Sequence, residues 1–428
     1  MFGAVRSRFA ALLLYLWFAF FRPQEWVYFD LGALHLSLAI ALLLIVPSVF
    51  SGIWPNLTHP LSVGMILFLA TALLSQVQAV DAAFGWQWIE YLASLTCVSL
   101  FSVSIIRTRR ELLLAVAVIT GSLGFHAAKA GLASMLAGGL QFADGLAGPW
   151  VDNNGYALAG AMIVYPLVAV GQNVRRRSVR YVCYLAAGLT VCTIVSTFSR
   201  EGFLALATAT VVFILLQRRR LMMVTVLAAV LLAGIAVVPV PDGYRERIQT
   251  IHTYREVADE SAISRLHFWQ VGLEMGLDRP FGVGLRNFDA AYDRYDFLDG
   301  AYGTHRSVHN SHVQVLAEMG FPGLVVWLSL LGYSGWVGLK VRSRASRGDL
   351  SSEEHYFDFT MANALLASMS AFVIGGSFIA LALNDLTWLT FALVASMERL
   401  SRVDAGARAP AYPVLGGNLA PVSHAAKI

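Results

Sequence analysis

The stretch PDGYRERIQTIHTYREVADESAISRLHFW (residues 241–269) opens the one long polar segment of an otherwise apolar chain, and HRSVHNSHVQVLAEMGFPG (residues 305–323) closes it. Between Val240 and Glu318 this segment holds eight arginines, no lysine, and five of the ten histidines. A planar guanidinium group binds phosphate through two parallel hydrogen bonds, which lysine cannot do. The composition therefore indicates a phosphate ligand. For any single arginine, pairing with one of the twelve acidic residues of the segment is the ordinary alternative.

Outside this segment the composition is that of a membrane protein. Mean hydropathy is +0.62, and 14% of the residues are charged, against roughly 25% in soluble domains. The apolar runs have the length of helices and lack strict alternation, so we expect an all-α polytopic membrane protein and not a membrane barrel. The three cysteines (Cys97, Cys183 and Cys192) fall in apolar runs and are expected to be buried without a disulfide or metal cluster.

About twelve apolar runs are candidate transmembrane helices, since one crossing needs roughly 20 residues. The first run, which ends at Phe21, is expected to be retained, because FRPQEW follows it instead of a cleavage site. The other runs cover approximately residues 31–50, 61–77, 91–106, 112–128, 156–170, 181–197, 203–216, 221–240, 320–339, 359–383 and 386–397.

Positive charges alternate with these runs and predict their orientation. The basic loops RTRR, RRRSVR, QRRR, KVRSR and ERLSR all follow even-numbered runs, and with the N-terminus they hold about twenty of the thirty-one lysines and arginines. The positive-inside rule makes that side cytoplasmic. Both termini are then cytoplasmic, and the long polar segment, between helices nine and ten, lies outside.

This topology divides the chain into four parts. Spans one to nine occupy residues 1–240, and a large, partly helical external loop occupies residues 241–319. Spans ten to twelve occupy residues 320–400, and residues 401–428 form a cytoplasmic tail whose low complexity predicts disorder.

Ionisable side chains in the apolar runs are almost confined to the ends of the runs; they are Glu90, His126, Arg200, Glu201 and Asp385. Charged groups in mid-membrane are costly and usually mark ion or proton pathways. Their scarcity disfavours a proton-coupled transporter. It favours an enzyme that acts on a lipid substrate at the outer interface.

Three stretches form an ordered set of motifs. STFSREGFLAL (residues 196–206) contains Arg-x-x-x-Leu, beginning at Arg200. SRLHFWQVGLEMGLDRPFGVGLRNF (residues 264–288) places Arg265 before an aromatic residue and continues to Asp-Arg-Pro and a Gly-x-Gly turn. HNSHVQVLAEMGFPG (residues 309–323) reads His-Asn-x9-Gly-x-x-Gly. In order, spacing and predicted topology these motifs resemble the O-antigen ligase and polymerase family of bacterial membrane glycosyltransferases.

The resemblance implies both a substrate and a location. The glycan donor of the enzyme would be a glycan on undecaprenyl diphosphate, and the acceptor would be a hydroxyl of lipid A–core. The reaction would take place at the periplasmic face of the bacterial inner membrane. Polymerases of repeat units and protein O-oligosaccharyltransferases belong to the same family, and the sequence leaves these alternatives open. Membrane lipids are expected partners. Nucleic acid is not, because the basic residues mark topology.

Glycan transfer from a diphosphate requires fixed cations for the leaving group and a base for the acceptor hydroxyl. The resemblance assigns the diphosphate to Arg200 and Arg265, and the base to His309, in a single inverting displacement. A surface pair with Asp259 or Glu260 is the ordinary alternative for Arg265, and a satisfied structural histidine is the alternative for His309.

No metal or other cofactor is expected, because the external loop has no Asp-x-Asp pair. Asp293, Asp296 and Asp299 recur every third residue, a spacing more typical of a solvated helix face or a turn. His305, His309 and His312 hint at a metal, but carboxylate or cysteine ligands at a suitable spacing are missing.

Five further residues are candidate substrate-binding residues. Arg286 follows the Gly-Val-Gly turn and is a third candidate phosphate contact. Glu318 and Asp385 are acidic residues near the external side, and a charge at a helix end is the alternative role for Glu318. Asn310 and His312 complete the set, because they lie next to His309 in the third motif.

Two non-enzymatic hypotheses remain beside the enzyme. A transporter of lipid-linked glycans would need polar residues in mid-membrane. A scaffold subunit would use the loop to bind a protein partner, and only an activity measurement separates it from an enzyme.

Overall fold

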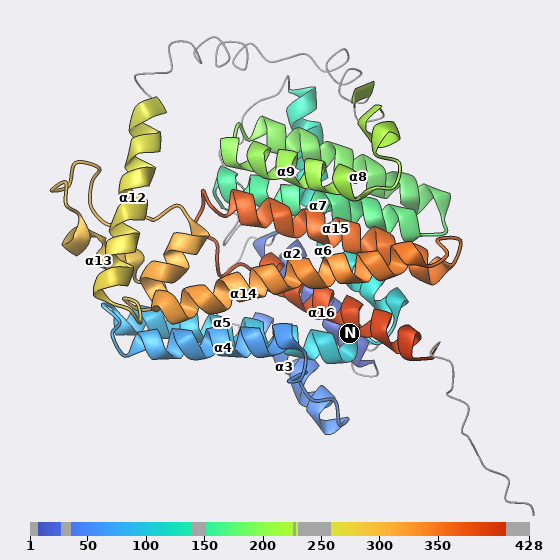
Figure 1. Ribbon diagram of the computed structural model, residues 1–428, viewed down its shortest axis with the longest axis horizontal. Helices are drawn as coiled ribbons and strands as arrows, with labels where there is room; N and C mark the ends of the chain where they lie inside the picture. Colours follow the sequence, from blue (N-terminus) through green and yellow to red (C-terminus); the bar gives the residue numbers. More distant parts are fainter. Residues whose placement is uncertain are drawn as a thin grey trace, which may run out of the picture.

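The computed structural model describes residues 7–26, 36–137, 145, 151–225, 228–229 and 258–407. Within them every regular element is helical, which confirms the all-α prediction for this part of the chain (Figure 1). The helices are α2 (Arg8–Phe21), the 3-10 helix η1 (Pro23–Trp26), α3 (Leu36–Phe50), α4 (Pro60–Gln76), α5 (Ala82–Ile105), α6 (Arg109–Leu136), α7 (Asn153–Asn173), α8 (Arg177–Ser196), α9 (Arg200–Leu216), α12 (Ala258–Asp278), α13 (Phe288–Tyr295), α14 (Ser311–Arg347), α15 (Glu353–Gly375) and α16 (Asp385–Ala407).

The chain is a multi-pass membrane protein by the length and apolarity of these helices. Six of them, α5, α6, α7, α8, α14 and α15, are long and apolar enough to cross a bilayer, and α2, α3 and α4 are shorter apolar helices. The predicted total of twelve spans remains a prediction. The predicted span at residues 221–240 lies largely outside the described residues.

Several helices begin well before the apolar runs that predicted them, because polar caps set their first turns. Asp81 caps α5 by accepting a hydrogen bond from the Phe84 amide at 2.9 Å, so this helix starts at Ala82 and not near residue 91. Thr108 and Glu111 form a reciprocal capping box at the start of α6. Hydropathy alone cannot detect such starts, since capping residues and first turns are polar.

The helices pack as a bundle in which α14 and α15 lie side by side (Figure 1). On one side α15 contacts α7 and α9, and on the other α14 contacts α4, which in turn contacts α5. Helices α12 and α13 lie at one end of the bundle, which we call the loop end.

The opposite end, which we call the basic end, gathers the loops that the charge pattern assigned to the cytoplasm. The Arg109 guanidinium pairs with Asp358 at 2.7 Å, and Arg175 pairs with Glu353 at 2.9 Å. Arg399 donates a hydrogen bond to the Ile106 carbonyl. These contacts join loops that are far apart in sequence at one end of the bundle.

The segment from 258 to 310, the described part of the loop that is predicted to be external and is called the external loop below, has a small hydrophobic core of its own. Phe268 of α12 and Phe288 and Tyr292 of α13 are fully buried in it, together with Val308. The loop therefore holds its side chains in fixed positions beside the bundle.

Toward the C-terminus α16 continues to Ala407, past residue 401, where the tail is predicted to start. Residues 408–428 lie outside the described residues.

Helix α14 is interrupted at Gly320, where φ is 67° and ψ is −167°. A Cβ atom at this position would lie 2.0 Å from the Pro280 carbonyl oxygen, so only glycine fits. The third sequence motif thus places its first glycine where the external loop packs directly against the start of the α14 span.

Candidate functional site

A cavity of about 940 Å³ opens at the loop end, and we call it the site cavity. Several separate parts of the chain form it: α2 and α5, the start of α7, the external loop with the first turn of α14, and the segment that leads into α16. Its lining residues are Arg22, Phe84, Gln87, Trp88, Tyr91, Asp152, Asn154, Arg286, Ser307, His309, Gln314, Ile379, Ala380, Leu381, Leu383 and Asp385.

His309 lines this cavity and is held by its two neighbours in sequence. Val308 is buried in the loop core, and Asn310 caps α14. His309 itself adopts a left-handed backbone conformation, with φ of 46°. Burial lowers the pKa of the His309 imidazole below its usual value, and the positive charges of Arg265 and Arg306 lower it further. The ring is therefore neutral at neutral pH, as a proton acceptor must be.

Arg265 lies close to His309 but is paired with an acidic residue from another motif. Its guanidinium forms an ion pair with Glu201 of α9, of which only 8% of the side chain is exposed. The side chains of Asp259 and Glu260, the alternative partners considered from the sequence, lie outside what the structure describes. The pair of Arg265 and Glu201 joins the first two motifs across the bundle.

Arg200 is the first residue of α9, and it is exposed and does not line the site cavity. Its neighbour Ser199 caps the helix, accepting from the Gly202 amide at 3.0 Å, and donates from its hydroxyl to Glu201 at 3.1 Å. Arg200 thus stands next to the carboxylate that Arg265 binds.

Arg286 projects into the site cavity from the turn after Gly284, with φ of 58°. Its guanidinium lies over the ring of Trp88, 4.6 Å from the ring centre. Its Nε atom is buried and makes no hydrogen bond within the described part of the chain. A buried donor of this kind is costly unless a ligand satisfies it, so Arg286 is well placed to bind an anion.

Glu318 lies behind the cavity wall and organises the turn that carries Arg286. Its carboxylate accepts hydrogen bonds from the Arg286 amide at 2.9 Å and from the Gln314 side chain at 3.2 Å. Its backbone carbonyl accepts from the Gly284 amide. Gln314, and not Glu318, lines the cavity.

Asn310 and His312 point into protein. The Asn310 side chain accepts from the amides of His312 and Val313, which caps α14. His312 accepts a hydrogen bond from the Trp327 indole through Nδ1 and donates from Nε2 to the Val373 carbonyl at 3.0 Å. Both ring nitrogens of His312 therefore have partners within the protein. Neither Asn310 nor His312 lines the site cavity.

Asp385 lines the site cavity at the start of α16 and accepts a hydrogen bond from the Tyr91 hydroxyl at 2.5 Å. Arg22, at the end of α2, lines the same wall. A charged, hydrogen-bonded wall therefore faces His309 and Arg286 from the N-terminal and C-terminal helices.

Sequence reasoning missed the cavity residues of the N-terminal helices, above all Arg22, Trp88, Tyr91 and Asp152. Arg22 carried one signal, because it is among the few cations on the predicted external side. The aromatic residues carried none, since aromatic residues are common at both membrane interfaces.

Backbone strain marks the same place. Arg22, Arg286 and His309 all line the site cavity with positive φ values between 46° and 58°. Non-glycine residues in this conformation are uncommon and cluster at functional sites, where the surrounding structure holds them.

The Asp293–Asp299 series does not form one group. Asp296 accepts from the amides of Leu298 and Gly300 and contacts the buried His267 ring at 2.8 Å. Asp293 accepts from the backbone of His305. These carboxylates build the turns of the external loop.

Comparison with known protein families gives two matches. Residues 185–328 match the family described as O-antigen ligase, and residues 1–170 match a family of unknown function (DUF5935). No curated protein matches the chain. The first match contains the lining residues Arg286 and His309, and the second contains Trp88 and Asp152, so the site cavity is built from both matched regions and from residues after them.

Proposed function

Because residues 185–328 belong to the O-antigen ligase family, we propose that this protein is a membrane glycosyltransferase that moves a glycan from undecaprenyl diphosphate to a hydroxyl of lipid A–core. The observation that carries the proposal is one cavity in which a neutral histidine, His309, faces an arginine, Arg286, that has a buried unpaired donor. A base and a phosphate-binding cation within one cavity are the two groups that this chemistry needs.

In the proposed reaction His309 takes the proton of the acceptor hydroxyl as its oxygen attacks the anomeric carbon. The bond between that carbon and the phosphate oxygen breaks at the same time, and the undecaprenyl diphosphate leaves with the electron pair. One displacement inverts the anomeric configuration. The imidazole then carries one extra proton, which it returns to water.

The donor diphosphate is assigned to the arginines around His309. Arg286 lines the site cavity and offers a buried Nε–H, while Arg265 of α12 and Arg200 of α9 do not line the cavity and are assigned from the sequence motifs. Fixed guanidinium groups stabilise the charge that develops on the leaving diphosphate, which is the task that a divalent metal performs in other transferases. Asp-x-Asp pairs are missing from the sequence, so we propose a reaction that does not depend on metal.

The acceptor is assigned to the wall from the N-terminal region. Trp88 and Tyr91 pack edge to face at 5.5 Å and offer apolar ring surface to a sugar. Asp152 and Asp385 can accept hydrogen bonds from sugar hydroxyls. This assignment gives the matched family of unknown function a part in recognising the acceptor.

The proposal is tested with the purified full-length protein in detergent or nanodiscs, incubated with undecaprenyl-diphosphate-linked glycan and lipid A–core. Transfer is followed by mass spectrometry of the acceptor, and the anomeric configuration by NMR. We expect transfer with inversion that persists in EDTA. Absence of transfer to any acceptor, with donor still bound, would contradict the enzyme. Loss in EDTA restored by magnesium would contradict the metal-free mechanism.

The same assay separates the other members of the family. A polymerase would extend a second lipid-linked repeat unit in place of lipid A–core, and a protein O-oligosaccharyltransferase would glycosylate a protein hydroxyl. Offering the three acceptors at equal concentration ranks them by kcat/KM.

A further inference from the structure

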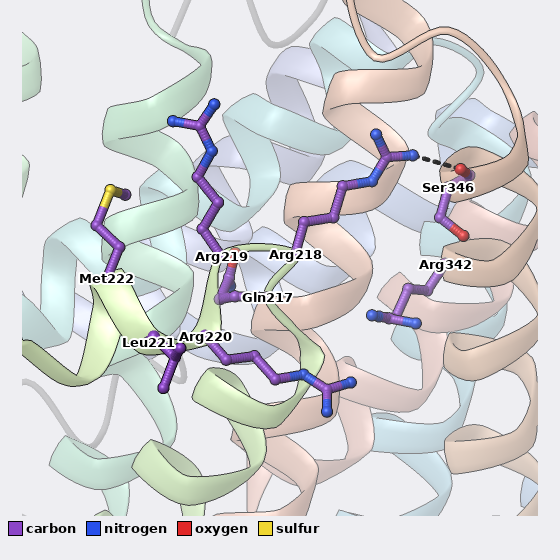
Figure 2. Close-up of a pocket in the computed structure, with 8 residues that line it drawn as sticks. All are labelled: Gln217, Arg218, Arg219, Arg220, Leu221, Met222, Arg342 and Ser346. Carbon is purple, nitrogen blue, oxygen red and sulfur yellow. Dashed lines mark hydrogen bonds between the residues drawn. The ribbon is translucent and has the colours of Figure 1, made fainter.

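A second cavity, of about 660 Å³, lies at the basic end between the loop after α9 and the last turns of α14. Residues from two elements more than a hundred positions apart converge on it (Figure 2). We call it the arginine pocket, and its lining residues are Gln217, Arg218, Arg219, Arg220, Leu221, Met222, Arg342 and Ser346.

Two of the arginines are held in place by backbone carbonyls. Arg342 donates to the Leu216 carbonyl from Nε at 3.2 Å and from Nη2 at 2.5 Å, which ties α14 to the end of α9. Arg218 reaches in the other direction to the Ser346 carbonyl, as Figure 2 shows. The Phe359 ring of α15 lies beneath both guanidinium groups, at 5.5 Å from Arg342 and 6.0 Å from Arg218.

No carboxylate balances these charges within the described residues. None of the eight lining residues is acidic, and the four arginines form no ion pair with any described side chain. Other cationic residues at the same end do have acidic partners, because Arg109, Arg175 and Lys340 each pair with a carboxylate. The bonds to backbone carbonyls fix two guanidinium groups without neutralising them.

The topology signal explains why this end is basic but not why these arginines converge. The positive-inside rule counts charges near the membrane and does not require them to share a cavity. A shared cavity concentrates positive potential and lowers the cost of binding an anion. Since a guanidinium group bonds two phosphate oxygens at once, a phosphate group is the anion that suits the arginine pocket.

Apolar side chains at the rim favour a lipid over a soluble phosphate. Leu221 and Met222 line the same pocket and are 83% and 49% exposed. Arg219 and Arg220, which precede them, are exposed as well. Cationic groups beside exposed apolar side chains match the phosphate and acyl chains of an anionic lipid.

We propose that the arginine pocket binds the phosphate of an anionic phospholipid in the leaflet that surrounds the basic end. The lipid would bridge Arg220 of the loop and Arg342 of α14 through one phosphate group. It would then strengthen the contact between α9 and α14. At their other ends α9 begins at Arg200, and α14 begins with the capped turn after His309. This binding does not depend on the proposed transferase activity.

The test compares two double variants of the full-length protein that lose the same charge. Arg219→Gln/Arg220→Gln alters the pocket while leaving the carbonyl bonds of Arg218 and Arg342 in place. Arg176→Gln/Arg177→Gln is the matched control, because both residues are exposed at the same end and lie outside the pocket. Binding of phosphatidylglycerol is measured by native mass spectrometry from mixed micelles, against phosphatidylcholine.

Each arginine near an anionic lipid surface contributes about a fivefold change in affinity, so the pocket variant should bind phosphatidylglycerol about 25-fold more weakly than the unaltered protein. The control should change less than about threefold, because screening by salt weakens distant charges. Equal losses in both variants would show a diffuse charge effect and overturn the proposal.

A second arm separates a lipid from a free phosphate. Phosphatidylglycerol should raise the Tm of the unaltered protein, and this rise should be lost in the pocket variant. Inorganic phosphate or diphosphate at millimolar concentration should not reproduce it. The soluble ions could instead raise the Tm of the unaltered protein as much as the lipid does and fail to raise it in the Arg219→Gln/Arg220→Gln variant. In that case the ligand is a free phosphate and the lipid assignment is wrong.

Discussion

Arginines gather at both ends of the helical bundle, but they are held in different ways. At the loop end Arg265 pairs with Glu201, and the Arg286 turn is bonded to Glu318. At the basic end Arg218 and Arg342 hydrogen-bond to backbone carbonyls and form no ion pair within the described residues. Carboxylates fix a guanidinium in one orientation and reduce its net charge, whereas carbonyls fix it and leave the charge intact. Arg265 at the loop end is therefore suited to positioning, and the arginine pocket at the basic end to attraction.

The comparison depends first on the two ends facing opposite sides of the membrane. Ala301 in the external loop and Ser178 at the basic end are exposed, so a cysteine placed there can react with a thiol reagent. Ala291 of α13 is only 1% exposed and would be a poor labelling position. In a background with Cys97, Cys183 and Cys192 changed to serine, Ala301→Cys should react with an impermeant thiol reagent in intact spheroplasts. Ser178→Cys should react only after lysis.

This all-or-none difference is the largest effect that we expect. Labelling of both positions only after lysis would place the site cavity in the cytoplasm and remove the periplasmic reaction. Labelling of Ser178→Cys alone in intact spheroplasts would invert the topology.

Removing the proposed base should give the next largest effect. His309→Ala should lower kcat by about 10²–10⁴-fold, the usual contribution of general base catalysis. Binding of the lipid-linked donor should be almost unchanged, since the arginines remain. His305→Ala is the matched control, because His305 is exposed and contacts Asp293 outside the cavity. Normal turnover in His309→Ala would exclude this residue as the base.

Arg265 tests whether the loop end works by positioning. Arg265→Ala should lower kcat/KM by about 10²–10³-fold, the effect of removing one group that stabilises developing negative charge, and it should weaken donor binding as well. Arg265→Lys should rescue only part of the loss, because lysine keeps the charge but cannot bond both Glu201 and a phosphate through a planar fork.

Arg294→Ala serves as the control for this change. Arg294 is exposed in α13, stacks on the Tyr295 ring and does not line the site cavity. Full rescue by Arg265→Lys would show that charge alone matters at the loop end, which would remove the contrast with the basic end.

The sequence was enough to predict the helical fold and the local surroundings of His309, the proposed base. The third motif places His309 beside a helix start, and its glycine at 320 allows the loop to pack on α14. Asp385 was predicted as a substrate-binding residue from its position at the end of an apolar run, and the structure places it in the site cavity.

Other parts of the site could not be predicted, because they depend on partners far away in the chain. Asn310 and His312 lie in the same motif as His309, but Trp327, Val373 and the α14 amides occupy their polar atoms. The wall of Trp88 and Asp152 exists only once the N-terminal helices pack beside α16 and the loop. Periodicity and motifs report local structure, and neither records such contacts.

Trp88 sharpens the comparison within the site cavity, between its donor and acceptor sides. Trp88→Ala removes a ring that supports Arg286 at 4.6 Å and faces the acceptor side. Losing ring surface that packs on the acceptor sugar costs about 1 kcal/mol, which corresponds to roughly a fivefold effect, so we expect KM for the acceptor to rise about 5- to 10-fold while kcat changes little. Trp86→Ala is the control, since Trp86 lies on the same helix, is exposed and does not line the cavity.

A rise confined to the donor KM would move Trp88 to the donor side and contradict the assignment of the N-terminal wall to the acceptor. An equal effect in Trp86→Ala would show that the start of α5 matters only for folding.

The smallest effect that we expect is a shift in pH dependence. Burial and the charges of Arg265 and Arg306 hold the pKa of His309 below its usual value of 6.5. The base form therefore persists into mildly acidic solution, and the acidic limb of kcat/KM should lie below pH 6.5, with activity falling about tenfold per pH unit beneath it. Arg306→Gln removes one of the two positive charges, so the pKa of His309 should rise and the acidic limb should move to higher pH.

Arg306 suits this test because its side chain is exposed and stacks on Phe268 without lining the site cavity. The plateau rate at high pH, where His309 is neutral in both proteins, should then be nearly unchanged. The acidic limb should also respond more strongly at low ionic strength, because salt screens an exposed charge. An acidic limb that stays in place in Arg306→Gln, or one that moves to lower pH, would show that a group other than His309 controls the reaction.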